Sequence, residues 1–186
     1  MPDLAQAIWL VLPVLLAGAT DAAIARAGLL RRLALPLDGG ARVGGVRLFG
    51  DGKTLRGVVV VVVATSLWTV LQWWLHRIGA APADLHPIDL DDVSARRAGA
   101  LMGLGYALGE LPTAAVKRQL GIAPGAAASG AARAIFWLVD QLDGAIGLIL
   151  LLSLLWPPPL PIALWTFAVF LAVHPAIDRL RTASAS

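Results

Sequence analysis

The chain has 186 residues, of which 58% are hydrophobic and 15% charged, and its mean hydropathy is +0.76. Soluble domains carry about 25% charged residues, so too little polar surface is present here for a water-soluble globule, and the apolar excess also excludes a disordered chain. The lack of cysteine excludes a disulfide framework, a thiolate nucleophile and a Cys-ligated zinc site. The composition therefore predicts an integral membrane protein.

Five apolar segments follow one another along the chain, each close to the length of about 20 residues that crosses a bilayer. They cover residues 4–20, 57–75, 98–116, 134–155 and 160–177. Helices satisfy their own backbone hydrogen bonds in lipid, and no alternating pattern indicates a β-barrel. We expect an all-α fold in which residues 1–186 form a single integral membrane domain with about five transmembrane helices. Its long loops are residues 21–56, between the first two spans, and residues 117–133.

Lys and Arg are distributed unevenly over the segments between the spans. Twelve of the fifteen basic residues fall in residues 21–56, in residues 117–133 and in the C-terminal tail. Because an excess of Lys and Arg marks cytoplasmic loops, we expect the N-terminus outside, and the C-terminus and both long loops in the cytoplasm. This topology explains the net charge of +3, and the basic residues do not gather on a soluble domain with base-stacking aromatic side chains, so no nucleic-acid partner is expected.

Three carboxylates lie inside predicted spans, where each costs a few kcal/mol and is therefore a functional candidate. Glu110 lies late in the third span, and Asp140 and Asp143 share one helix face near the start of the fourth. On the predicted topology all three lie at one depth near the cytoplasm, where oxygen ligands alone suit Mg²⁺ with phosphate groups completing its shell. The alternatives are structural ion pairs with basic residues of 117–133, and an ion pathway, although the outer halves of the spans offer few polar residues for one.

A Gly-rich basic segment, Phe49–Gly57 (FGDGKTLRG), directly precedes the second span. It is not a P-loop, because Arg47 stands where Walker A requires glycine and no strand precedes it. Its glycines allow backbone amides to approach a ligand, its threonine suits a helix N-cap, and two cations one helical turn apart can bind phosphate at a helix N-terminus. These residues are Gly50, Gly52, Thr54, Lys53 and Arg56. The alternative is a basic turn that contacts lipid headgroups.

Two more polar segments complete the candidate site. A turn over residues 36–40 (PLDGG) carries Asp38, and Lys117 and Arg118 follow Glu110 by seven and eight residues. A helix with this spacing can present its acid and both cations to a Mg²⁺–triphosphate, although flanking by cytoplasmic basic residues explains the two cations equally well. The histidines His76 and His86 fall on the outer side of the membrane, and we expect no chemistry from them.

Four sequence blocks, in this order and spacing, resemble the CDP-archaeol synthase family, which are membrane cytidylyltransferases related to CDP-diacylglycerol synthases. The blocks are PLDGG at 36–40, FGDGKTLRG at 49–57, VKRQLGI at 116–122 and VDQLD at 139–143. The chain departs from the pattern at Leu55, where the family usually has Trp, and at Glu110, where related synthases have Asp.

This resemblance implies an enzyme that uses CTP and a phosphorylated lipid in the membrane, releases pyrophosphate, requires Mg²⁺ and serves membrane phospholipid biosynthesis. Together with the reasoning above it assigns metal binding to Glu110, Asp140 and Asp143, and catalytic phosphate contacts to Lys53, Arg56, Lys117 and Arg118. Substrate binding is assigned to Asp38, Gly50, Asp51, Gly52 and Thr54.

The acceptor implied by the family is an archaeol-type lipid phosphate, such as 2,3-bis-O-geranylgeranylglycerol phosphate. The sequence leaves open a diacylglycerol phosphate as acceptor, a small non-enzymatic transporter that uses the acid cluster, and a non-catalytic membrane protein that retains the blocks. It also leaves open the oligomeric state, with a homodimer among the options.

Overall fold

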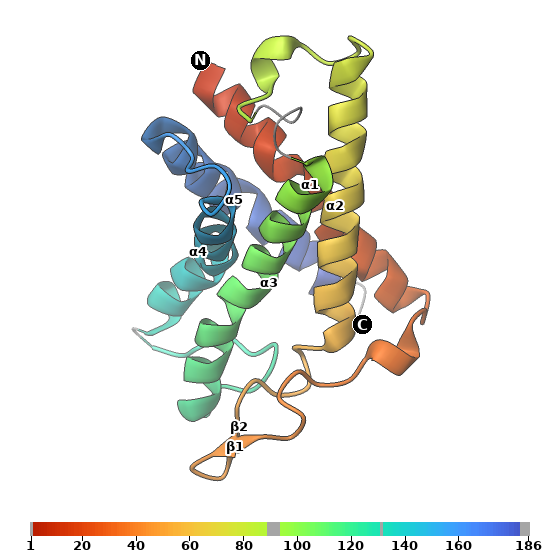
Figure 1. Cartoon of the computed structure of the whole chain (residues 1–186). Helices are drawn as coiled ribbons and strands as arrows, with labels where there is room; N and C mark the ends of the chain where they lie inside the picture. Colours follow the sequence, from red (N-terminus) through yellow and green to blue (C-terminus); the bar gives the residue numbers. More distant parts are fainter. Residues whose placement is uncertain (1, 89–93, 131, 183–186) are drawn as a thin grey trace.

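The computed structural model describes residues 2–88, 94–130 and 132–182, with side chains described up to residue 173, and it consists mainly of five long helices (Figure 1). The helices are α1 (Pro2–Arg26), α2 (Leu55–Arg77), α3 (Ala95–Gln119), α4 (Ala132–Leu152) and α5 (Leu160–Thr182). The connections contain the 3₁₀ turns η1 (Arg31–Leu33) and η2 (Ala83–Leu85) and a short hairpin, β1 (Arg42–Val43) and β2 (Val46–Arg47). The predicted helical architecture is therefore confirmed, with one helix for each predicted span.

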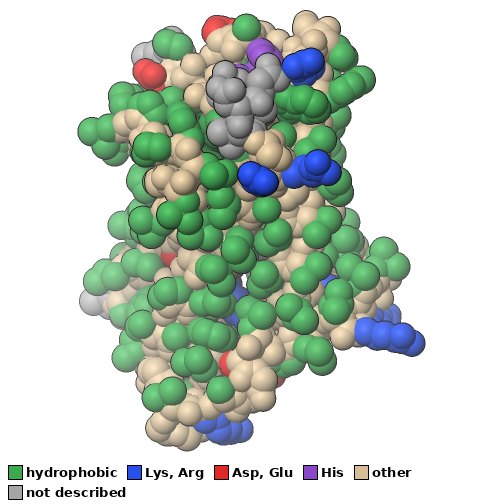
Figure 2. Space-filling view, viewed as in Figure 1, with side chains coloured by type: hydrophobic (Ala, Val, Ile, Leu, Met, Phe, Trp, Pro, Cys, Tyr) green, Lys and Arg blue, Asp and Glu red, His purple; other side chains and the backbone are tan. Residues whose placement is uncertain are grey.

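Three of these helices, α1, α2 and α4, are long and apolar enough to cross a membrane. In α5 the apolar stretch within the described side chains is Leu160–Val173. On the face shown in Figure 2, hydrophobic side chains cover most of the surface and charged side chains are few, as expected for a protein surrounded by lipid. The predicted fourth span reached residue 155, but α4 ends at Leu152, because Ser153–Leu155 forms a turn that leads into the prolines 157–159.

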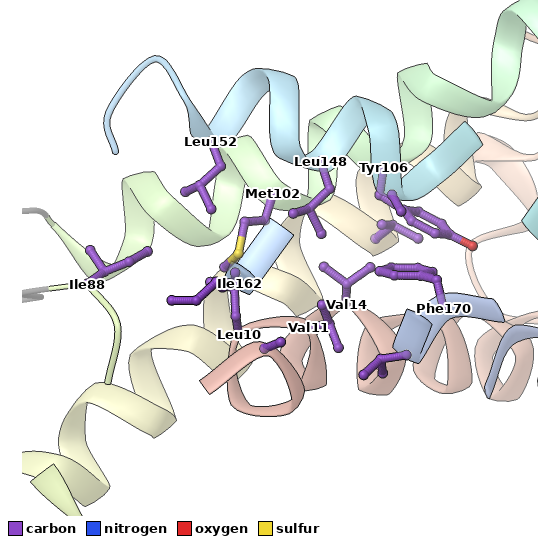
Figure 3. Packing of buried hydrophobic residues seen from close by; sticks show 14 residues of the cluster. Leu10, Val11, Val14, Ile88, Met102, Tyr106, Leu148, Leu152, Ile162 and Phe170 are labelled. Atoms are coloured by element: carbon purple, nitrogen blue, oxygen red, sulfur yellow. The ribbon is translucent and has the colours of Figure 1, made fainter. Parts of the chain in front are cut away.

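The hydrophobic core lies where α1, α3, α4 and α5 meet (Figure 3). Met102 and Tyr106 of α3 project into it, and the Tyr106 ring stacks on Phe170 of α5 with 6.0 Å between ring centroids. The other fully buried members include Val11, Val14, Leu148 and Leu152. This core fixes α3 between its neighbours and so fixes the depth of the polar residues that follow Tyr106 along α3.

Glycines bring α3 into direct backbone contact with its two neighbours. A Cβ on Gly103 would lie 2.9 Å from the Val61 carbonyl oxygen of α2, whereas a Cβ on Gly109 would lie 2.3 Å from the Asp143 carbonyl oxygen of α4. On the α4 side, a Cβ on Gly147 would lie 2.0 Å from the Gly105 carbonyl oxygen. Contacts between small residues allow transmembrane helices to approach this closely. As a result, α3 and α4 touch at the level of Glu110 and Asp143, and their carboxylates face a common region.

The loop after α1 is closed at its base and lies at the same end of the bundle as the loop between α3 and α4 (Figure 1). The amide of Leu37 donates to the Lys53 carbonyl at 2.9 Å, and the amide of Leu55 donates to the Leu35 carbonyl at 2.8 Å. The hairpin inside the loop, which the sequence did not predict, turns at Gly44–Gly45, where both φ angles are positive (58° and 83°) as a tight two-residue turn requires. This closure holds Lys53 at the start of α2.

Candidate active site

A polar cavity of about 320 Å³ lies at this end of the bundle, between the end of α3, the first half of α4 and the two loops. Six of the seven residues predicted to bind metal or phosphate line it: Lys53, Glu110, Lys117, Arg118, Asp140 and Asp143. The expected convergence of the three acids is therefore observed, and the spacing of Asp140 and Asp143 places both on the face of α4 that borders the cavity. We call this space the catalytic cavity.

Two lysines cross the catalytic cavity to pair with two of the carboxylates. Lys53 Nζ contacts Glu110 Oε2, and Lys117 Nζ contacts Asp140 Oδ2. All four side chains are at least partly shielded from solvent, with exposed fractions between 13% and 35%, so these pairs are stronger than ordinary surface pairs. Three cations face three carboxylates in the cavity, so its formal charge is balanced before any substrate enters.

Asp143 is held differently from the other two acids. Its Oδ1 accepts a hydrogen bond from the Gly144 amide at 2.7 Å, and the Thr113 side chain of α3 also hydrogen-bonds its carboxylate. Asp143 is buried, with 8% of the residue exposed. Because Thr113 lies one helical turn after Gly109, the close contact between α3 and α4 brings its side chain to Asp143.

Arg118 has no hydrogen-bond acceptor for two of its nitrogens among the residues that the structure describes. The residue is 8% exposed, and its Nε and Nη1 are fully buried. A buried guanidinium without acceptors is costly, and acceptor oxygens supplied by a ligand in the catalytic cavity would relieve that cost. Arg118 therefore marks the cavity as a site for an anion.

The donor set of the cavity fits Mg²⁺. Carboxylate oxygens are the ligands that Mg²⁺ prefers, and it usually takes only one or two of them together with substrate phosphate oxygens. Within the described ranges no three His, Asp or Glu residues lie together as a preformed metal cluster. Glu110 and Asp140 are each paired with a lysine here, so a metal ion would compete with these lysines for the carboxylate oxygens.

A second polar cavity, of about 340 Å³, lies on the other side of the Lys53–Glu110 pair, which lines both spaces. Arg56, the seventh predicted residue, lies there rather than in the catalytic cavity. Its Nε is 4.0 Å from Asp21 Oδ1, and both atoms are buried without a hydrogen-bond partner in the described part of the chain. No role for Asp21 is predicted from the sequence, where its only signal is its position as an acid directly after the first predicted span.

Thr54, also at this second cavity, is the N-cap of α2 as predicted, and its Oγ1 accepts from the Gly57 amide at 3.2 Å. Asp51 lines the same cavity, but its side chain is mostly exposed. Gly52 lines both cavities, and a Cβ there would lie 3.9 Å from the Cβ of Pro124, which lines the catalytic cavity.

Asp38 organises the loop and does not line either cavity. Its carboxylate makes two hydrogen bonds with the Arg47 guanidinium, at 2.5 and 3.1 Å, and it accepts from the amides of Gly40, Phe49 and Gly50 at 3.0–3.1 Å. The Arg47 guanidinium, helped by these amides and opposed by burial, holds the pKa of Asp38 well below its usual range. Asp38 and Gly50, predicted to contact substrate, are thus engaged in holding the loop, and Arg47 is the partner that the sequence analysis missed.

Comparison with known proteins decides the family. The model of the CarS-like CDP-archaeol synthases matches residues 3–180. The chain belongs to the CDP-archaeol synthase family. The assignment made from the four sequence blocks is confirmed, and with it the class of enzyme, a CTP-dependent cytidylyltransferase.

Individual relatives agree with this family assignment. The CDP-archaeol synthase of Halobacterium salinarum is 32% identical over 151 residues, which cover 81% of this chain and 73% of that protein. The CDP-archaeol synthase of Methanopyrus kandleri is 30% identical over 175 residues, covering 92% of this chain and 84% of that protein. A solved structure of an intramembrane enzyme for archaeal membrane lipid biosynthesis superposes with a TM-score of 0.65, at 28% identity and 92% coverage of both chains.

Proposed function

We propose that this member of the CDP-archaeol synthase family joins the cytidylyl group of CTP to an archaeol-type lipid phosphate in the catalytic cavity. An oxygen of the lipid phosphate attacks the α-phosphorus of CTP, the bond from that phosphorus to the bridging oxygen of the β-phosphate breaks, and pyrophosphate leaves. The observation that carries the proposal is the joining of Lys53, Lys117 and Arg118 with three carboxylates in one cavity at the end of an apolar bundle.

The chemistry asks mainly for alignment and charge neutralisation. A phosphate monoester has a second pKa near 6, so the attacking oxygen is largely deprotonated at pH 7 and needs no general base from the protein. Lys53, Lys117 and Arg118 bind phosphate oxygens and stabilise the charge that develops on the leaving pyrophosphate. The two lysines exchange a carboxylate partner for a phosphate partner, while Arg118 gains the acceptors that it lacks in the free enzyme.

Glu110, Asp140 and Asp143 are the residues that would hold Mg²⁺, which supplies charge neutralisation for the triphosphate. The oxygens of Glu110 and Asp140 are released from their lysines at the same time as the triphosphate neutralises those lysines. Asp143 stays fixed by Thr113 and the Gly144 amide and so gives the site one carboxylate of constant position.

The location of the cavity supports a cytoplasmic site at the membrane boundary. The two loops that border it, residues 21–56 and 117–133, contain ten of the fifteen basic residues and lie at one end of the bundle. We propose that this end faces the cytoplasm, with five helices crossing the membrane and the N-terminus outside. All six charged residues of the catalytic cavity come from one chain, so the chemistry does not require a homodimer.

The test is an assay of the purified enzyme in lipid nanodiscs with radiolabelled CTP and a panel of lipid phosphates, comparing archaeol-type ether lipids with diacylglycerol phosphate. We expect a labelled CDP-lipid and an equal amount of pyrophosphate, only with Mg²⁺ and most efficiently with the ether lipid. Preference for the diacyl lipid would correct the acceptor, and the lack of product with every lipid would refute the proposed reaction.

A further inference from the structure

An apolar groove of about 400 Å³ runs between α3 and α4, outside the polar cavities described above. Its floor is the glycine contact of the two helices, formed by Gly105, Gly109 and Gly147, where no side chain fills the space. Its walls include Leu108 of α3 and Ile146 and Leu150 of α4, whose exposed fractions are 43%, 46% and 63%. The groove is therefore an apolar channel open to the side of the bundle, which we call the α3–α4 groove.

One end of the α3–α4 groove meets the catalytic cavity. Thr113 and Asp143 line both spaces, and they are the most polar residues of the groove. Along α4 the groove extends from Val139 to Leu151, twelve residues or about 18 Å at the rise of an α-helix. This length is slightly more than half of the roughly 30 Å hydrocarbon core.

This arrangement matches a molecule with a phosphate at one end and a hydrocarbon chain at the other. The phosphate end meets Lys117 and Arg118, which line the catalytic cavity together with Asp143. The chain end meets aliphatic side chains and glycine backbone, which suit a hydrocarbon chain and can make van der Waals contacts with it. The second polar cavity offers no comparable surface, because Asp21, Asp51 and Arg56 line it.

We propose that one hydrocarbon chain of the lipid-phosphate substrate lies in the α3–α4 groove, with its phosphate at the Thr113–Asp143 end. The proposal rests on the proposed function, since it names where the acceptor of that reaction binds. It gives the glycines of α3 and α4 a second role, because the same contact that brings the carboxylates together leaves the groove open. It also makes Leu108, Ile146 and Leu150 the residues that set chain preference.

The experiment narrows the groove without changing the catalytic cavity. Ile146→Trp and Leu150→Trp place a larger apolar side chain at exposed positions of the groove wall, so no buried packing is disturbed. Leu67→Trp is the matched control, because Leu67 of α2 is 65% exposed and does not line the groove. KM and kcat are measured for CTP, for a long-chain lipid phosphate and for a short-chain analogue with only a few carbons in each chain.

We expect KM for the long-chain lipid to rise about tenfold in the two groove variants, because the indole ring takes the place of chain atoms and removes their van der Waals contacts with the groove. KM for CTP and turnover of the short-chain analogue should stay at the wild-type level, and Leu67→Trp should change none of these values. Equal KM values for the long-chain lipid in the groove variants and the control variant would refute binding of the chain in the α3–α4 groove and would leave the proposed reaction intact. Failure of the wild-type enzyme to form a CDP-lipid would instead overturn the reaction itself.

A measurement on the unmodified protein keeps the proposal testable if a Trp variant folds poorly. A long-chain lipid phosphate carrying a photoreactive diazirine in one chain is crosslinked in nanodiscs, and the labelled peptides are mapped by mass spectrometry. Labelling within residues 146–151 that unlabelled lipid phosphate suppresses, and an equal amount of a neutral lipid does not, supports the groove. Labelling spread over α1, α2 and α5, or insensitive to the phosphate competitor, overturns it.

Discussion

The Arg118 guanidinium has two effects that one substitution can test. Its buried nitrogens destabilise the free enzyme, and in the proposed complex they bind phosphate oxygens of CTP. Its Nε and Nη1 are buried without acceptors in the described part of the chain, and each buried donor in this state costs about 1–3 kcal/mol. Arg118→Met keeps most of the aliphatic stem, which packs near Gly50, and removes the guanidinium. We expect the free variant to be more stable than wild type by about 1 kcal/mol or more, or a Tm higher by about 2–4 °C.

The same substitution should weaken CTP binding. Hydrogen bonds to charged groups contribute about 1.5–3 kcal/mol, so loss of the guanidinium should raise the Kd of Mg·CTP roughly 10- to 100-fold. Thermal unfolding followed with and without Mg·CTP measures both effects, and the stabilisation by nucleotide should be lost in the variant. Arg32→Met, at an exposed position after α1, is the control and should change neither quantity. A lower Tm together with unchanged CTP affinity would show that Arg118 is structural and does not bind the nucleotide.

Three further predictions concern the contact between α3 and α4, the loop after α1, and a histidine at the opposite end of the bundle. Gly109→Ala should lower the free energy of unfolding by about 2–3 kcal/mol and reduce activity, because its Cβ would lie 2.3 Å from a carbonyl oxygen of α4. Gly57→Ala is the control and should be tolerated, because the nearest neighbour of its Cβ is at 3.6 Å. Chemical unfolding and turnover measurements compare the two variants. Asp38→Asn should loosen the loop and raise KM for CTP, although Asp38 itself does not line either cavity. Asp51→Asn is the control and should have a small effect, because the Asp51 side chain is exposed. Limited proteolysis within residues 38–52 measures the loosening of the loop. Burial, reinforced by the neighbouring His76, lowers the pKa of His86, so on acidification the unfolded chain binds the proton before the folded chain does. The Tm of the wild type should therefore fall as the pH drops below about 6.5, and His86→Gln should flatten this dependence. Equal slopes of Tm against pH in the wild type and the variant would exclude His86 as the cause.

The sequence predicts the helices and the acids of this site well because both signals are local. Apolar runs long enough to cross a bilayer become helices wherever they occur, and the i, i+3 spacing of Asp140 and Asp143 places both on one face before any packing is known. Glu110 is conspicuous for the same reason, as a charge inside an apolar segment.

What the sequence does not predict depends on distances between segments far apart in the chain. Arg56 resembles a partner of Lys53 by spacing, yet Lys53 lines both cavities whereas Arg56 lines only the second, where it faces Asp21 of α1. Asp38 resembles a ligand, but Arg47 and three amides occupy it once the loop closes. Gly109 suggests flexibility in isolation, whereas the structure uses it for a backbone contact that positions Asp143.

In the proposed function, the carboxylates of α3 and α4 are the metal-binding centre of a CTP-dependent cytidylyltransferase. The most direct test is Asp143→Asn, a nearly isosteric change at the carboxylate fixed by Thr113 and the Gly144 amide, assayed for CDP-lipid formation in nanodiscs at saturating Mg²⁺. We expect a loss of at least about a hundredfold in turnover, the scale of removing one electrostatic contact to the reacting groups, with an unchanged thermal unfolding transition. Wild-type turnover by this folded variant would contradict the claim.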